Sequence, residues 1–405
     1  MLKLNKYIAP KLLVSALVLA SMDVNAVPFT FEARSLGMGG TNVATADLAT
    51  AVWANPAMLT NQRPGDDFSL LIGVGAFLRD NDDLVTDVDD FQSANDRLDQ
   101  AADGSLEEVA ILADMSAIVR RIEGKVIAPE ATGVLAVGAA FDSWAMAISA
   151  RGDVIAGGTV TDLACDLAEP DCDIATFKSQ IQSDQYNMLN LEGVLATELG
   201  VAFATAFPVM DRKFSIGVKP KIVDLQGVTF TESIRTADVG FDNISDEDNN
   251  FDIGTFTSID LGLAYDISES VRLGLNVRNL ITDEFQLQNH VLNFDTGARL
   301  GVAYHSPHVT LAVDYDLVEN EPLLANPAFD GLKTQFLNLG AEFNAFDFAQ
   351  LRLGASRNMA SGISGTAKNT AYTAGIGFWL GFNLDIAATF ADNTVGGFLQ
   401  TGFRF

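Results

Sequence analysis

The sequence is poor in basic residues, and this shortage limits the partners that the protein can have. Lys and Arg together number 25 against 53 Asp and Glu, so the 405-residue chain has a formal net charge of −28. Proteins bind the phosphates of nucleic acids mainly through Lys and Arg. We therefore exclude nucleic acid as a partner.

Histidine and cysteine are also scarce. The three histidines have no sequence pattern of nucleophile and base or of metal ligands around them. We predict no catalytic residues, no metal site, no cofactor and no enzymatic activity, an outer-membrane hydrolase being the weaker alternative. The two cysteines, Cys165 and Cys172, lie close together in a chain that we expect to be exported, where disulfides persist, so we expect them to be bonded.

Long apolar runs are missing as well. The run Leu12 to Ala20 is too short to span a bilayer as a helix, which needs about 20 apolar residues, and no later stretch reaches that length. Lysines precede this run and small residues follow it (Lys3, Lys6, Lys11; Val24-Asn25-Ala26). We predict that residues 1–26 are a secretory signal peptide, the alternative being a membrane anchor.

The sequence has instead a repeating period of two. In Val271 to Arg278 (VRLGLNVR), apolar residues alternate with Arg, Gly and Asn, which gives an extended strand one apolar and one polar face. About fourteen such runs follow residue 66, near 67–78, 131–141, 143–155, 191–207, 213–230, 254–266, 270–282, 293–305, 308–318, 333–344, 348–358, 370–380, 383–391 and 397–405.

Short and long connections alternate between these runs. Asp142-Ser143 and Ser306-Pro307 are tight links, whereas 79–130 and 156–190 are long. A soluble β-sandwich, the alternative, has no reason to place its long loops at one end, but a bacterial outer-membrane barrel has short periplasmic turns and long outer loops. We predict an all-β fold: a transmembrane antiparallel β-barrel of about 14 strands over 67–405, surrounded by outer-membrane lipid in a Gram-negative bacterium.

The end of the chain favours the same fold. Leu399, Thr401, Phe403 and Phe405 share one face of the last run, and the chain ends on the phenylalanine. This ending resembles the signal by which outer-membrane barrels are handed to their assembly machinery. We therefore expect the barrel assembly machinery to be a partner through Phe405.

Residues 27–66 precede the first strand and are rich in Gly and Ala. A barrel of fourteen strands encloses a lumen that its own side chains cannot fill. Small residues allow the backbone to pack closely against other elements. We predict that residues 27–66 fold into the lumen as a plug, the alternative being a loose periplasmic tail.

The same segment carries a family resemblance. Leu36-Gly37-Met38-Gly39-Gly40 and Asn55-Pro56-Ala57 resemble the N-terminal signature of the FadL/OMPP1-type transporters of hydrophobic compounds. The length and the acidic, helical first insertion look closest to the branch of exported barrels called conjugal transfer protein TraF. This branch is distinct from the thioredoxin-like protein of that name, whose redox motif is absent here.

The resemblance implies a plug that contains Gly37, Gly39, Gly40, Asn55, Pro56 and Ala57. It also implies uptake of a small hydrophobic ligand, such as a fatty acid, through a wall opening near a kinked strand. Pro220 is the candidate for such a break, because proline cannot donate a ladder hydrogen bond; a proline at the rim is the alternative. The alternative function is a structural or interaction barrel in conjugal transfer or cell contact.

The first long connection, 79–130, is expected to contain a helix. Ser105 to Glu108 (SLEE) forms a capping box, and the apolar residues after it recur at helical spacing until Gly124. Such a helix either lines an apolar entrance or packs on neighbouring loops. Charged residues on the polar faces of later runs, such as Arg299 and Asp316, are expected to form an inward-facing network that holds the plug, or else a selectivity filter.

Overall fold

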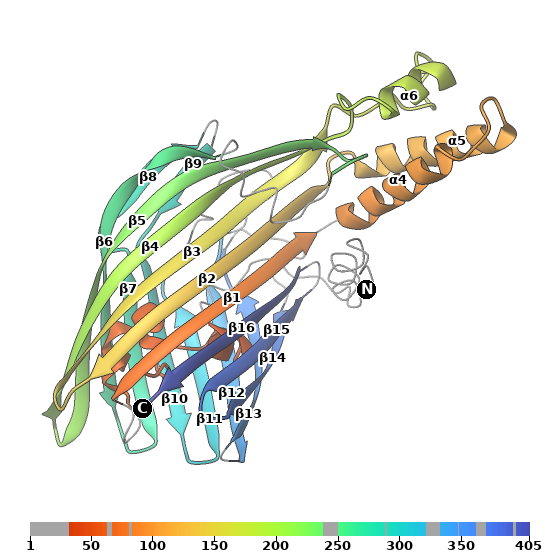
Figure 1. The fold of residues 1–405 in the computed structure, drawn as a ribbon. Helices are drawn as coiled ribbons and strands as arrows, with labels where there is room; N and C mark the ends of the chain where they lie inside the picture. Colours follow the sequence, from red (N-terminus) through yellow and green to blue (C-terminus); the bar gives the residue numbers. More distant parts are fainter. Residues whose placement is uncertain are drawn as a thin grey trace, which may run out of the picture.

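The computed structural model describes residues 32–62, 67–80, 83–237, 250–287, 290–320, 333–346, 348–361, 370–391 and 394–405. The predicted signal peptide lies outside these ranges. Within them, fourteen strands form one closed antiparallel barrel in which β1 pairs with β16 (Figure 1). The predicted fourteen-strand barrel is confirmed. Its strands are β1 (Phe68–Asp80), β2 (Val126–Ala140), β3 (Trp144–Thr161), β4 (Met188–Val209), β5 (Arg212–Ser233), β6 (Asn250–Asp266), β7 (Val271–Arg278), β10 (Gly297–His305), β11 (Val309–Asp316), β12 (Phe336–Phe346), β13 (Ala349–Asn358), β14 (Thr370–Trp379), β15 (Asn383–Ala391) and β16 (Thr394–Arg404).

The two ends of the barrel differ in the length of their connections, as predicted. Short turns join β2 to β3, β4 to β5, β6 to β7, β10 to β11, β12 to β13 and β14 to β15. We call this the short-turn end, and the C terminus lies there (Figure 1). The other connections gather at the opposite end, which we call the long-connection end.

The wall is taller on one side than on the other. Strands β4 and β5 have 22 residues each, whereas β7 and β11 have eight. The predicted runs 191–207 and 213–230 were therefore too short. The strands continue because Leu189, Leu191 and Phe230 pack against helices beyond the barrel, which gives their extra residues an apolar partner.

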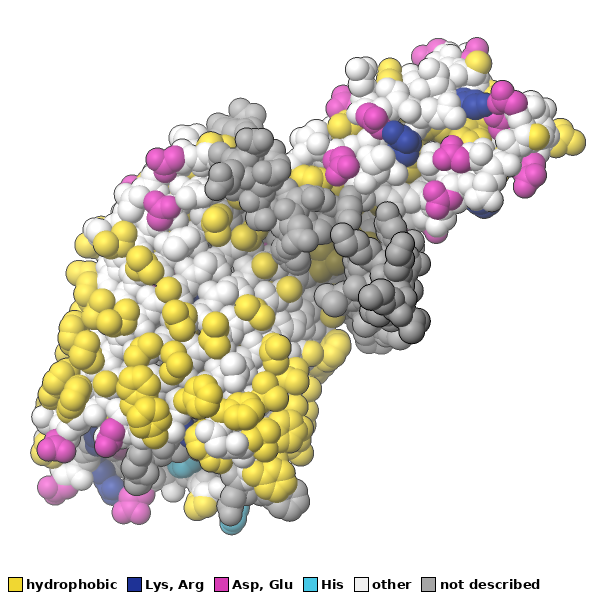
Figure 2. All heavy atoms as spheres, in the orientation of Figure 1, with side chains coloured by type: hydrophobic (Ala, Val, Ile, Leu, Met, Phe, Trp, Pro, Cys, Tyr) yellow, Lys and Arg dark blue, Asp and Glu magenta, His cyan; other side chains and the backbone are white. Residues whose placement is uncertain are grey.

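Side chains alternate between the outside and the inside of the wall. In β1, Ile72 and Val74 are exposed on the outer surface, whereas Leu71 and Phe77 are buried inside. Figure 2 shows the result as a band of apolar side chains around the visible wall, with acidic side chains at both rims. Successive side chains of a strand point to opposite faces, so the alternation in the sequence gives the wall an apolar outer face.

Three helices extend from the long-connection end and form what we call the arm (Figure 1). They are α4 (Leu84–Leu98), α5 (Leu106–Ile122) and α6 (Ile174–Ile181). The predicted helix, α5, is confirmed, with the Ser105 hydroxyl accepting a hydrogen bond from Glu108 N at 3.0 Å. None of the helices in the described ranges is long and apolar enough to cross a membrane.

Sequence reasoning missed α4 and α6. In the stretch that forms α4, many carboxylates hide the helical spacing of Leu84, Val88 and Phe91, which the structure buries. Helix α6 has only eight residues, too few for a clear period, and falls in the predicted loop 156–190. Between β3 and α6, Cys165 and Cys172 are joined by a disulfide.

A small hairpin, β8 (Asp283–Leu287) and β9 (His290–Phe294), stands outside the barrel sheet at the long-connection end. The predicted runs 270–282 and 293–305 left residues 283–292 between them as a connection, and the structure corrects this, because β8 and most of β9 lie there. The hairpin forms because it buries Leu292 and packs Phe285 and Phe294 against Phe256 of β6, with ring centroids 5.6 and 4.7 Å away.

Candidate functional site: the luminal segment

Residues 32–62, which we call the luminal segment, lie inside the barrel near its short-turn end (Figure 1). Their regular elements are short: α2 (Ala33–Gly37), α3 (Ala51–Ala54) and the 3₁₀ helix η1 (Pro56–Thr60). Nearly all residues of the segment are buried, including Leu36, Trp53 and Leu59. The segment thus fills a lumen that the wall side chains leave open.

Asn55 joins the luminal segment to itself and to the wall. It is fully buried, and its Nδ2 donates to Val43 O at 2.9 Å and to Leu263 O of β6 at 3.1 Å. Its Oδ1 accepts from Ala57 N at 3.1 Å and caps η1, while Pro56 occupies the first turn. Proline suits this position because its missing N–H is not needed there.

Gly39 and Gly40 form a turn that other residues cannot adopt without strain. Their φ angles are +68° and +89°, in the left-handed region that favours glycine. A Cβ on Gly39 would lie 2.4 Å from Leu339 O of β12. Gly37 is also close to the wall, since its Cβ would lie 3.1 Å from Gly375 Cα. These glycines let the backbone of the segment approach that of the barrel.

Glycines of the barrel wall lie opposite the luminal segment and allow the same close approach. Sequence reasoning missed these glycines. A Cβ on any of these inward-facing residues would come within 2.6 Å of a backbone or side-chain atom of the luminal segment: Gly217, Gly262, Gly274, Gly340 and Gly354. They come from β5, β6, β7, β12 and β13. A glycine on the polar face of successive runs was the signal that could have revealed them. We call them the wall glycines.

Charged groups tie the luminal segment to the wall. The Arg34 guanidinium makes a two-point ion pair with Glu342 of β12, at 2.8 and 3.0 Å, and Glu342 also pairs with Arg352 at 2.9 Å. The Asp314 carboxylate accepts from Asn42 N and Val43 N at 2.7 and 3.0 Å. The inward-facing network predicted from the charges is therefore present, and it holds the segment by charge-assisted bonds.

A second group of charges lies next to the segment, toward the long-connection end. Glu198 of β4 pairs with Lys219 at 2.5 Å and with Lys221 at 3.2 Å, and Lys221 pairs with Asp260 of β6 at 2.9 Å. All four side chains are buried. We call these four residues the charged layer.

Strand β5 shows how the interior changes along the barrel axis. Gly217 contacts Pro56 of the luminal segment, Lys219 and Lys221 belong to the charged layer, and Val223 and Leu225 belong to an apolar cluster. We call this cluster the apolar layer; its buried members are Ala128, Val194, Ala196, Val223, Leu225, Phe256 and Leu292. Along β5 from the long-connection end, the interior of the barrel is therefore first apolar, then charged, and then filled by the luminal segment.

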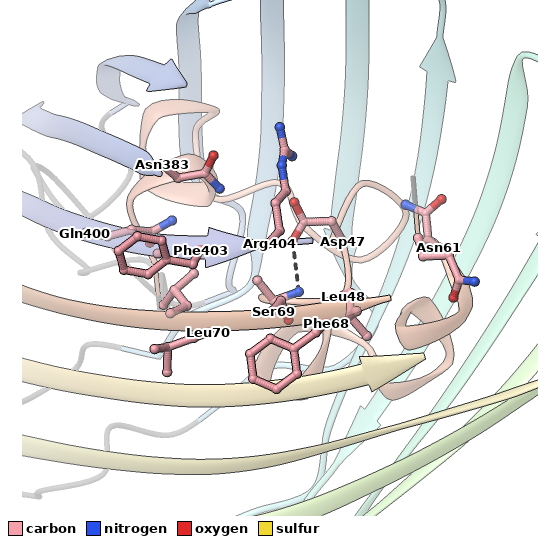
Figure 3. A pocket seen from close by; sticks show the side chains of 14 residues that line it. Asp47, Leu48, Asn61, Phe68, Ser69, Leu70, Asn383, Gln400, Phe403 and Arg404 are labelled. Carbon is pink, nitrogen blue, oxygen red and sulfur yellow. Dashed lines mark hydrogen bonds between the residues drawn. The ribbon is translucent and has the colours of Figure 1, made fainter. Parts of the chain in front are cut away.

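Little space remains beside the luminal segment at the seam of β1 and β16. Figure 3 shows the residues around the gap there: Asp47 and Leu48 of the segment, Phe68 to Leu70 of β1, and Gln400, Phe403 and Arg404 of β16. Its volume of about 20 Å³ is room for a single water molecule. The segment thus closes on the wall at this seam.

A larger cavity of about 620 Å³ opens at the short-turn end, below the segment. Its lining is mostly polar or charged and includes Arg34, Arg272, His305, His308 and Gln350. Residues of the luminal segment, such as Arg34, Thr45 and Asn61, line one side of this cavity. Two of the three histidines lie there, with His305 Nδ1 3.0 Å from Thr310 Oγ1.

Pro220 lies within β5 rather than at the rim. The pairing of β4 with β5 lacks partners opposite Lys219 and Pro220 but keeps the same register on both sides, from Gly200–Lys221 to Phe203–Val218. The strand therefore continues through Pro220 with a local loss of pairing, as expected for a residue without an N–H. The register shift of this strand is elsewhere, at Leu225/Gln226 against β6.

Comparison with known proteins gives one family and one fold. The model of a family described as "F plasmid transfer operon, TraF, protein" matches residues 52–316. No curated protein sequence matches the chain.

Several solved structures share the fold. The Pseudomonas putida toluene transporter TodX aligns over 93% of this chain and 99% of its own, with 13% identity and a TM-score of 0.54. The Ralstonia pickettii toluene transporter TbuX aligns over 93% and 98%, with 12% identity and a TM-score of 0.54. A Pseudomonas aeruginosa FadL homologue aligns over 95% and 99%, with 11% identity and a TM-score of 0.51. The architecture is thus shared at very low identity.

Proposed function

Because this chain belongs to the family described as F plasmid transfer operon, TraF, protein, and folds as a closed barrel, we propose that it is an outer-membrane channel of a Gram-negative bacterium. The channel takes up small hydrophobic compounds, such as fatty acids, and the luminal segment is its plug. The similar structures are named as transporters of toluene or as a FadL homologue, which favours this ligand class.

The outer wall supports the placement in lipid. Its band of exposed apolar side chains would be unstable in water, whereas lipid accepts it, and the closed sheet leaves no unpaired strand edge. Phenylalanine contributes most of the exposed aromatic side chains near the short-turn end, such as Phe207, Phe343 and Phe403. Phe405 is exposed and stacks on Phe68, with ring centroids 5.0 Å apart, where the barrel assembly machinery can reach it.

The apolar layer is the observation that carries the ligand class. Phe256, Leu225 and Val194 lie inside the barrel, separated from the plug by the charged layer, and the β8–β9 hairpin brings Phe285 and Phe294 to the same cluster. A small apolar molecule gains free energy by leaving water for such a site. A polar solute gains nothing there, so the layer selects hydrophobic compounds.

The charged layer and the plug oppose transport along the barrel axis. An apolar molecule that moved past Leu225 would have to separate the buried pairs of Glu198 with Lys219 and Lys221, which is costly. The exit that we propose is through the wall at Pro220, which lies between Lys219 and Lys221 at the level of the charged layer, where β4 and β5 lose pairing. A molecule that leaves there enters the charged layer but does not cross all of it or reach the plug.

A second candidate function is favoured by the family description. A barrel connected with plasmid transfer can act as an interaction protein whose outer surface meets a partner. The two functions make different demands, because an interaction barrel needs its exposed loops but not its apolar layer.

Uptake by intact cells tests the transport proposal. Cells that produce the protein should take up radiolabelled oleate or toluene faster than cells with an empty vector. The double substitution Phe285→Ser with Phe294→Ser should reduce this uptake several-fold, because it removes both hairpin rings from the apolar layer.

The matched control is Phe348→Ser, which removes an exposed ring at the short-turn end. The amount of folded barrel in the outer membrane is measured for every variant, so that uptake is compared at equal levels. Uptake no faster than that of the empty vector, with the barrel folded and present, would contradict the transport proposal.

A further inference from the structure

We propose that the arm carries a docking surface for a cationic, amphipathic segment of a partner protein. The surface is the exposed side of α5 around Leu106 and Val109. The inference rests on the outward orientation of the long-connection end under the proposed function, but not on transport. It gives the second candidate function a specific surface and a partner chemistry.

The arm has a complete core of its own. Phe91 of α4, Leu112 and Met115 of α5, and Phe177 and Ile181 of α6 are all buried in one cluster. The ends of β4 and β5 join the same cluster, so the helices are fixed to the barrel. Apolar residues that remain exposed on the arm are therefore not explained by missing internal packing.

Helix α5 keeps a second apolar side that packs against nothing in the described parts of the chain. Leu106 is 91% exposed and Val109 40% exposed, and Ala110 and Ala113 are exposed as well. Their spacing of three and four residues places the four side chains on one side of the helix. Exposed apolar stripes of this kind, bordered by charge, are typical of surfaces that bind another protein. We call these four residues the α5 stripe.

The charge of the arm selects the partner. Residues 83–125 and 162–187 contain 17 acidic and 5 basic residues. Figure 2 shows acidic side chains outnumbering Lys and Arg on the visible face of the arm. Two of the acidic residues, Glu107 and Asp114, lie on α5 next to the α5 stripe.

All five basic side chains of the arm already have acidic partners within it. The pairs are Arg97–Asp114, Arg120–Asp166, Arg121–Asp87, Arg121–Asp90, Lys125–Asp87, Lys178–Asp103 and Lys178–Glu108. Hydrogen bonds to the carboxylates of Asp103 and, to a smaller extent, Glu108 raise the pKa of Lys178, so the Lys178 side chain stays charged. The acidic residues still outnumber them by more than three to one, so the field around the arm is negative.

These charges exclude two other occupants. A second copy of this chain would bring the same negative field to the contact, and an anionic lipid surface would be repelled in the same way. A partner segment with lysine or arginine on one face and apolar side chains on the other satisfies both features of the surface. Its charges accelerate the encounter, and its apolar face covers Leu106 and Val109.

Binding of a designed peptide to the full-length protein in detergent tests the proposal. The probe is a fluorescent 14-residue helix with leucines on one face and lysines on the other, and its affinity is measured by anisotropy. We expect binding that the double substitution Leu106→Ser with Val109→Ser weakens about tenfold. These serines change no charge, so a purely electrostatic attraction would leave the affinity the same.

The matched control is Met210→Ser, because Met210 is 88% exposed but lies in the short turn between β4 and β5. It should bind the peptide like the unmodified protein, and a peptide with the same composition in scrambled order should bind more weakly than the amphipathic one. Equal affinity for both peptides, equal affinity of the α5 variant, or no binding at all would overturn the proposal. Uptake of oleate should be unchanged in the α5 variant, which separates this result from a failure of the transport proposal.

Discussion

Single glycines decide how closely the luminal segment and the wall approach each other. Gly39 is needed for its backbone angle, whereas Gly262 is needed because a Cβ there would lie 2.1 Å from Asn55 Oδ1. The backbone angle is a requirement of the luminal segment itself, whereas the missing Cβ is a requirement of the strand that faces it. An extra methyl group at such a contact can be accommodated only if the segment moves away from the wall, which costs free energy.

Gly262→Ala should therefore displace the luminal segment without unfolding the barrel. We expect the substitution to weaken the packing of the segment against the wall by about 1–3 kcal/mol. Because a displaced segment fills the lumen less completely, the single-channel conductance in planar bilayers should rise. Gly133→Ala is the control, because a Cβ on Gly133 has nothing within 4 Å. Equal conductance of the two variants would show that the wall glycines do not position the segment.

Asn55→Ala should loosen the same contact from the other side. The substitution removes three hydrogen bonds and leaves Val43 O, Leu263 O and Ala57 N without this partner. We expect a loss of about 2–4 kcal/mol, because buried polar groups left unpaired are costly. Limited proteolysis of the segment in the detergent-solubilised protein should accelerate. Asn61→Ala, which removes only the bond to Ala46 O, should change the cleavage rate far less.

At the scale of elements, the strands could be predicted from the sequence and the helices mostly could not. The alternation in Val271 to Arg278 depends only on the two environments of a barrel wall, and this signal survives without any knowledge of the fold. Helix α4 instead packs on α5, so the apolar side of α4 can be recognised only when the position of α5 is known. The same holds for the β8–β9 hairpin, which forms around Phe256.

The candidate site was predictable in part for a similar reason. The family signature indicated Asn55 and the glycines of the segment, and the structure places all of them against the wall. Their partners Gly262, Asp314 and Glu342 are distant in sequence and come close only when the barrel closes. The contacts therefore follow from the strand register, which the sequence pattern leaves open.

The disulfide is expected to act only on the arm. Its bond closes a short loop between β3 and α6, and removing it by Cys165→Ser with Cys172→Ser frees this loop in the unfolded state. We expect the arm to lose about 2.5 kcal/mol of stability by the loop-entropy estimate, and hydrogen exchange in α6 to accelerate. Exchange in the barrel strands should stay the same; faster exchange in β10 to β16 would contradict this.

At the scale of the whole molecule, the outer wall distinguishes a membrane protein from a soluble one. Leu353 lies on the outer face in the middle of β13 and is 58% exposed. In lipid, Leu353→Arg should cost about 2–4 kcal/mol and lower the urea midpoint of the barrel in vesicles. A water-exposed wall would tolerate the same charge. Met210→Arg, in a short turn, is the control and should leave the midpoint unchanged.

The position of the luminal segment in the chain has a consequence for the order of assembly. The segment precedes β1, yet it is bonded to strands as late as β14 and β16, through Thr373 and Gln400. The segment is synthesised before all the strands, but some of its contacts can form only after the last strand has been synthesised. The segment is continuous with β1 and contacts β16, so we expect the pairing of β1 with β16 to form around residues 32–62. Packing of the interior and closure of the cylinder are on this account a single event.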